Sequence, residues 1–170
     1  MNAAKNKNGR VEESARLIAI EELSEAPLVE MAQYWETKRA GRKTPLRSDM
    51  NPADFVRLMP RIFMLRVGPD PLTFTYSLIG DDNVQAHGRN FTGWNVRDLD
   101  NIWPGYGTSM HDFYALILRR AKPQAACGEM SFVDRGFCRF EAVYLPLAVA
   151  DGTIGHIMGA AVYKFEKNTV

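Results

Sequence analysis

The sequence predicts an α+β fold in which helices cover one face of an antiparallel sheet. Hydrophobic residues make up 46% of the 170-residue chain and charged residues 24%, which is ordinary for a single globular domain. The spacing of apolar residues is helical before Pro60 and alternates with a period of two directly after it. Dense turn signals then separate strand-like segments, as is typical of hairpins. These observations predict five strands, two before and three after a helical stretch that crosses the sheet.

The chain begins with residues 1–10, which are polar and predicted to be disordered. A short helical pattern is possible over 11–23. A firmer helix is predicted over 27–39, where Ser24 can cap the start and apolar side chains repeat at helical spacing: Leu28, Met31, Ala32 and Trp35. We therefore assign residues 1–26 to a flexible or helical extension and residues 27–167 to the folded domain.

Five basic residues and no acidic residue lie between positions 38 and 47: Lys38, Arg39, Arg42, Lys43 and Arg47. The stretch follows the predicted helix, where the partial negative charge of the helix end favours cations. It could bind an anionic partner. A solvated helix end and loop explain the same residues, and we adopt this interpretation.

The strands are predicted from alternating apolar residues and from the turns between them. Segments 62–67 and 72–79 form a hairpin, and a single helical turn capped by Asp81 and Asp82 follows. An aromatic loop over 89–107 leads to a helix over about 108–121, started by Thr108 or Ser109, whose buried side is Met110, Phe113, Tyr114 and Ile117. The last three strands are predicted over 125–133, 138–149 and 154–165.

Composition excludes several classes of protein. Lys and Arg total 21 against 20 acidic residues, so the chain lacks the basic excess of a dedicated nucleic-acid-binding domain. No apolar run approaches the ~18–20 residues of a membrane span. We therefore expect a cytoplasmic protein that binds neither nucleic acid nor membrane. Cys127 and Cys138 lie on the two strands of a predicted hairpin but are not opposite each other. They are therefore too far apart for a disulfide, and we expect two free thiols.

A series of short motifs extends over roughly residues 28–165. They are Tyr34-Trp35, Lys38-Arg39-Ala40-Gly41-Arg42, Pro45, Arg47-Ser48-Asp49, Pro52, Met59-Pro60, Phe74-Thr75-Tyr76, Gly80, Gly88-Arg89-Asn90, Thr92-Gly93, Glu141, Leu145-Pro146-Leu147, Asp151-Gly152 and Gly159. In this order and spacing, the chain resembles a bacterial family of single PAS domains with an N-terminal helix. Ser77 and Asp81 depart from the family pattern, in which we expect Arg and Thr.

The resemblance implies a PAS fold with strand order 2-1-5-4-3. It also implies a stand-alone sensory or regulatory domain that acts in bacterial signalling, by small-molecule sensing, by protein–protein interaction, or by both. The partner could be a signalling protein such as a kinase. The alternative from a different class is a small α+β-cone enzyme, isomerase- or thioesterase-like, that uses the same pocket. A buried acid or histidine with a strongly shifted pKa in that pocket would favour the enzyme.

Motifs for catalysis and for cofactors are weak or missing. The sequence has no phosphate-binding loop, no Gly-x-Ser-x-Gly turn and no His-Glu-x-x-His helix, so we expect no catalytic site. No two histidines stand at metal-ligand spacing, and we expect no metal. His111 is the one candidate for a haem ligand, but it lies on the flank of its helix. Cys138-Arg139-Phe140 is similar to a flavin-binding motif but lies on a strand, so neither haem nor flavin is expected.

A pocket for a small organic ligand is expected between the longer helix and the sheet. The candidate residues are aromatic, methionine or aliphatic: Tyr76, Trp94, Tyr106, Phe113, Tyr114, Ile117, Met130, Phe140 and Met158. Such residues also form ordinary cores, so a filled core is the competing interpretation.

The second face of the sheet predicts self-association. Alternation assigns seven apolar side chains to this outer face: Val143, Leu145, Leu147, Ile157, Ala161, Tyr163 and Phe165. Monomers rarely leave such a patch in water, so either the N-terminal helix folds over it or a second copy covers it. We expect both at once, in a homodimer.

Overall fold

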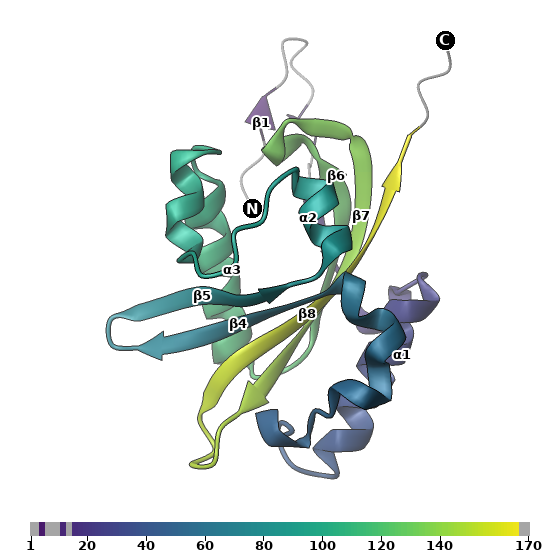
Figure 1. Cartoon of the computed structure of the whole chain (residues 1–170), viewed down its shortest axis with the longest axis vertical. Helices are drawn as coiled ribbons and strands as arrows, with labels where there is room; N and C mark the ends of the chain where they lie inside the picture. The colour runs from purple at the N-terminus through teal and green to yellow at the C-terminus, as the bar shows by residue number, and fades with distance from the viewer. Residues whose placement is uncertain (1–3, 6–10, 13–14, 167–170) are drawn as a thin grey trace.

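A computed structural model describes residues 4–5, 11–12 and 15–166, and its centre is a six-stranded antiparallel sheet (Figure 1). The strands lie in the order β3-β6-β7-β8-β4-β5. Their bounds are β3 Ala15–Ile18, β4 Ile62–Pro69, β5 Leu72–Ile79, β6 Gln124–Met130, β7 Arg135–Ala148 and β8 Ile154–Phe165. Without β3 this is the predicted five-strand order 2-1-5-4-3, which is confirmed. The predicted number of strands in this sheet, five, is one too low.

The additional strand corrects the helical pattern predicted over 11–23. Ala15–Ile18 pairs with β6 at the sheet edge, and Ile20–Glu22 forms a short 3-10 helix, η1. Three apolar residues at helical spacing are too few to stabilise an isolated helix. The free edge of β6, by contrast, offers a row of backbone partners. The short strands β1 (Ala4–Lys5) and β2 (Val11–Glu12) pair with each other. Most of the predicted disordered stretch 1–10 lies outside the described residues.

Helix α1 (Ala26–Arg39) packs on the outer face of the sheet, on the side opposite α3 (Figure 1). Leu28, Met31 and Trp35 are buried there, as the apolar spacing predicts. The predicted cap is wrong, because the hydroxyl of Ser24 caps no backbone group of the helix. Ser24 instead donates to the carboxylate of Glu141 on β7, and so does the backbone N–H of Glu25.

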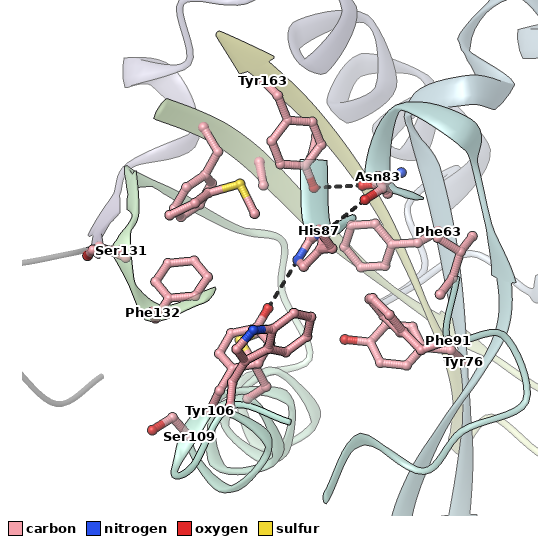
Figure 2. Close-up of a pocket in the computed structure, with 18 of the residues that line it drawn as sticks. Phe63, Tyr76, Asn83, His87, Phe91, Tyr106, Ser109, Ser131, Phe132 and Tyr163 are labelled. Atoms are coloured by element: carbon pink, nitrogen blue, oxygen red, sulfur yellow. Dashed lines mark hydrogen bonds between the residues drawn. The ribbon is translucent and has the colours of Figure 1, made fainter. Parts of the chain in front are cut away.

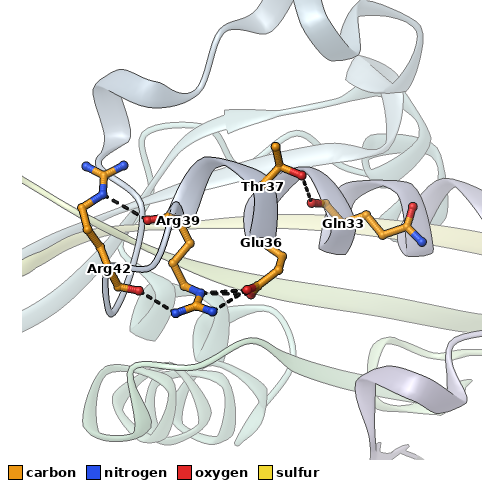
Figure 3. Close-up of polar contacts among 5 residues, drawn as sticks. All are labelled: Gln33, Glu36, Thr37, Arg39 and Arg42. Atoms are coloured by element: carbon orange, nitrogen blue, oxygen red, sulfur yellow. Dashed lines mark hydrogen bonds and ion pairs between the residues drawn. The ribbon is translucent and has the colours of Figure 1, made fainter.

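The other end of α1 is held by its own arginines (Figure 3). The Arg42 guanidinium donates to the backbone carbonyls of Lys38 and Arg39, at 2.8 and 3.1 Å. Arg42 also pairs with Asp49, Arg39 pairs with Glu36, and Lys38 pairs with Asp54. Three of the five cations in this stretch are thus neutralised within the chain, which supports its interpretation as a helix end.

The outer face is covered by α1 and by the 3-10 helix η3 (Pro52–Arg61), a shorter element η2 (Arg47–Asp49) lying between them. Eight buried residues of the sheet form its core: Ile62, Met64, Ala125, Val143, Leu145, Leu147, Met158 and Ala160. Three residues assigned to this face belong to the inner one instead: Ile157, Ala161 and Tyr163. Phe165 is half exposed at the strand end.

These three residues are predicted on the wrong face because the predicted register of β8 is shifted by one residue. Leu145 lies opposite Met158 and Val143 opposite Ala160, so the even-numbered residues of β8 share the outer face with the odd-numbered residues of β7. Because α1 and η3 cover this face within one chain, a second copy is not needed to cover it. The homodimer stays a prediction.

The inner face carries α2 (Asp81–His87), the 3-10 helix η4 (Val96–Asn101), α3 (Tyr106–Arg120) and the short η5 (Ser131–Val133). Helix α3 begins two residues earlier than predicted, after Gly105, whose φ of +84° suits a glycine. Thr108 therefore caps nothing on α3, and its hydroxyl donates to Asp100. No helix in the described part of the chain is long and apolar enough to cross a membrane. Both cysteines are free, as predicted.

Candidate ligand-binding site

A cavity of about 470 Å³ lies between the inner face of the sheet and the helices α2 and α3 (Figure 2). Protein interiors are otherwise close-packed, with few voids larger than a water molecule. Side chains from the strands β4 to β8 and from α2 and α3 form much of the wall, and residues of η5 and the loop residues Phe91 and Trp103 also line it. The volume is within the range of small-molecule sites.

Five of the nine candidate pocket residues line this cavity: Tyr76, Tyr106, Tyr114, Met130 and Phe140. Three others, Trp94, Phe113 and Ile117, pack in the inner core without reaching the cavity wall. Met158 is buried on the outer face, against the α1 side of the sheet, because the register of β8 differs from the predicted one.

His87, the last residue of α2, places an imidazole in the wall. Its Nδ1 lies 2.9 Å from the backbone carbonyl oxygen of Asn83. A carbonyl can only accept, so Nδ1 carries the proton and Nε2 is left as a free acceptor. The aromatic rings around it belong to Phe91, Trp103, Tyr106 and Tyr163, with centroids 5.3 to 6.5 Å away.

Burial among these rings lowers the pKa of His87 to about 4, a shift that the bond to Asn83 opposes and the nearby Arg135 cation reinforces. The imidazole is therefore neutral at pH 7. Tyr106 is the cavity residue that comes nearest to Nε2, with its hydroxyl oxygen 3.5 Å away. That distance is at the outer limit of a hydrogen bond.

Several tyrosine hydroxyls point into the same space. Tyr76 and Tyr114 share a hydrogen bond of 3.0 Å, and Tyr163 donates to the side-chain oxygen of Asn83 at 2.8 Å. The hydroxyl of Tyr144 has no hydrogen-bond partner among the described residues. Burial raises the pKa of Tyr76 to about 12 and that of Tyr144 further, so these phenols are neutral.

Charge is nearly absent from the wall. Among the described residues that line the cavity there is no lysine and no arginine, and Asp134, on the exposed turn after η5, is the single charged side chain. The cavity is thus aromatic, with neutral donors and one strong neutral acceptor.

His111 lies elsewhere. Its Nε2 donates to the backbone carbonyl of Leu72 and its Nδ1 accepts from Arg97, both at 3.1 Å. It does not line the cavity, and with both ring nitrogens bonded it is not placed to bind a ligand there. Within the described ranges, no cluster of three His, Cys, Asp or Glu side chains could hold a metal ion.

Seven polar residues of the wall are outside the set predicted from the sequence: Asn83, His87, Ser109, Ser131, Asp134, Tyr144 and Tyr163. Tyr144 had a usable signal, since it alternates with Phe140 on one face of a strand. Tyr163 is predicted on the outer face but lies on the inner one, because of the register of β8. Asn83 and His87 are four residues apart on α2, a helix that the sequence predicts only as a single turn, so their shared side was not visible.

A family described as PAS domain matches residues 23–162 of the chain. Neither the curated proteins nor the solved structures include a match.

Proposed function

The chain belongs to a PAS domain family, a class of sensory and signalling domains, and we propose that it senses a small organic molecule bound in the cavity beside His87. The observation that carries this proposal is a cavity of about 470 Å³ whose wall includes polar groups with weak partners or none. The hydroxyl of Tyr144 and Nε2 of His87 are the two clearest examples.

Polar groups that line a cavity without a strong protein partner are free to bond to water or to a ligand. A ligand with matching polar atoms would supply those bonds while its apolar part replaces water against the aromatic wall. This combination of an apolar wall and a few convergent polar groups is typical of binding sites for small molecules.

The response to binding would pass to another protein by contact. The cavity wall includes η5 and the end of α2, which reach the surface at Ser131 and Gly88. A rearrangement around a ligand would therefore alter an accessible surface. A signalling partner such as a kinase, and the homodimer, stay predictions.

One observation favours the enzyme alternative, namely a histidine with a strongly lowered pKa inside the pocket. A pKa of about 4 makes His87 a weak general base, because an efficient base has a pKa near the working pH. The wall also brings no carboxylate within hydrogen-bond distance of His87 to orient it, since Nδ1 donates to a backbone carbonyl. A binding role fits this imidazole better than proton transfer.

The test uses two neighbouring positions on β8 that face opposite sides of the sheet. Ala161 lines the cavity, whereas Val162 packs on the outer face. A library of small organic molecules is screened against the whole chain by native mass spectrometry and thermal shift. We expect at least one compound to bind one-to-one. Ala161→Phe should weaken its binding at least ~10-fold by filling the cavity, and Val162→Phe should leave it within ~2-fold.

Two results would overturn the proposal. In the first, no compound of the library binds the wild-type chain. In the second, a compound binds equally well to wild type and to a folded Ala161→Phe variant, which would place its site outside the cavity.

A further inference from the structure

Building on the proposed function, we infer that the ligand is an uncharged aromatic molecule that donates a hydrogen bond to Nε2 of His87. The inference depends on three features of the wall: the fixed direction of the imidazole, the rings around it, and the lack of cations.

The imidazole is fixed by its backbone bond. Because Nδ1 donates to the carbonyl of Asn83, the ring cannot present a donor to the cavity, and Nε2 faces the space between α2 and α3 (Figure 2). The hydroxyl of Tyr106 lies 3.5 Å from Nε2, whereas a good bond is ~2.7–3.0 Å long. A ligand N–H or O–H at normal distance would therefore improve on the bond that His87 makes now.

The wall around this acceptor favours a flat ring. Phe91 presents its ring edge to His87 with an angle of 78° between the planes, and Tyr163 does so with an angle of 85°. Elsewhere in the wall, the rings of Tyr106 and Phe132 stack on each other, with centroids 5.0 Å apart and planes 10° from parallel. Aromatic pairs gain from such offset and edge-on contacts, so a planar ligand can make both kinds at once.

The charge of the wall selects against ions. A carboxylate or phosphate would lose its hydration with no lysine or arginine among the lining residues to replace it. Arg135, the cation near His87, is outside the wall and donates to the backbone carbonyl of Gln85. A quaternary ammonium could rest on the rings, but it carries no N–H or O–H for Nε2. The volume of about 470 Å³ suits a compound of one or two rings.

Four naphthalene probes separate these chemistries, each titrated into the whole chain by isothermal calorimetry at pH 7. They are 2-naphthol, 2-methoxynaphthalene, 2-naphthoate and a naphthylmethyl-trimethylammonium salt. The second differs from the first by one methyl group on the oxygen, which removes the hydrogen-bond donor. We expect 2-naphthol to bind ~10-fold more tightly than the methyl ether, the effect of about one net hydrogen bond, and both ions to bind more weakly than 2-naphthol by at least ~10-fold.

Two variants assign the preference to one nitrogen. His87→Phe keeps a ring and removes the acceptor, so 2-naphthol and its methyl ether should bind within ~2-fold of each other. Tyr106→Phe removes the competing donor, so the preference for 2-naphthol should be kept or increased. If His87→Phe does not fold, Tyr106→Phe still tests the inference. If this variant no longer prefers 2-naphthol over its methyl ether, the ligand bonds to Tyr106 and not to His87, and the inference is overturned.

The outcomes also separate this inference from the proposed function. Equal binding of 2-naphthol and its methyl ether to wild type, or tighter binding of either ion, overturns the ligand class and leaves small-molecule sensing intact. The same holds if library compounds bind but no naphthalene probe does. Failure of every probe and every library compound overturns both.

Discussion

Trp35 on α1 and Pro146 on β7 are joined by a buried hydrogen bond, in which the indole Nε1–H donates to the proline carbonyl at 2.8 Å. The bond crosses from the covering helix to the sheet and connects residues 111 positions apart. Pro146 has no N–H of its own to offer the ladder, and its carbonyl is taken by the indole. The pair therefore fixes both the position of α1 and the rotation of its buried side.

Trp35→Phe should destabilise the chain by ~1–3 kcal/mol, since the ring is largely kept but the buried carbonyl loses its partner. Equilibrium unfolding in urea measures the change. Tyr34→Phe is the matched control on the preceding residue, because its hydroxyl donates to Asp54 and accepts from the Asn51 N–H near the surface. We expect the control to cost less than half as much, and equal losses would contradict the role given to the Trp35 bond.

Glu141→Gln should weaken the attachment of α1 at its other end. The carboxylate accepts three hydrogen bonds from Ser24 and Glu25. Burial would raise the pKa of Glu141, but these bonds and the nearby Lys164 outweigh it and lower the pKa on balance. A carboxyl with a lowered pKa stabilises the fold above its unfolded pKa of ~4.3, and this stabilisation is lost as the pH falls through the folded value.

The wild type should therefore be more stable than Glu141→Gln by ~1–2 kcal/mol at pH 7, with a smaller difference at pH 3. Urea unfolding of both proteins at the two pH values measures this. A difference that does not depend on pH would mean that the charge of Glu141 contributes nothing.

Arg42→Ala should cost ~1 kcal/mol, because the Arg42 side chain donates to the carbonyl of Arg39 (Figure 3). The same side chain also donates to the carbonyl of Lys38 and pairs with Asp49. Lys43→Ala is the neighbouring control. Lys43 is exposed and forms no ion pair with the described residues, so its loss should be near zero. Thermal unfolding of the two variants distinguishes a specific cap from a general effect of positive charge.

Much of the scaffold could be predicted from the sequence, because its signals are local. Alternation and turns predict the five strands, and the family resemblance implies their order. Some of the residues that carry the family resemblance hold α1 in place: Tyr34, Trp35, Arg42, Asp49, Glu141 and Pro146. The cavity could not be predicted to the same depth. Its polar groups depend on the register of β8 and on the length of α2, and a one-residue slip moved Met158 and Tyr163 to the wrong faces.

His87 predicts a pH dependence of stability. Its folded pKa of about 4 is below the unfolded value of ~6.5, so the unfolded chain binds a proton that the folded chain does not. The stability is complete above pH ~6.5 and is lost as the pH falls toward 4, by roughly 3 kcal/mol from this group. His87→Phe should flatten the curve between these values. His156 also has a lowered pKa, through burial and the nearby Arg47 and Arg66, and it contributes to the pH dependence of both proteins. The contribution of His87 is therefore the difference between the stability curves of the wild type and the variant.

Removal of residues 1–39 tests what covers the outer face. This deletion takes away α1 and β3 and bares the patch around Val143, Leu145 and Met158, which Leu28 and Trp35 otherwise cover. An apolar patch of that kind drives association, so we expect the truncated chain to aggregate. Deletion of residues 1–14 is the control, because it leaves β3 and α1 in place and should stay soluble. Light scattering after gel filtration measures both, and a soluble chain lacking residues 1–39 would show that α1 is not needed to cover the sheet.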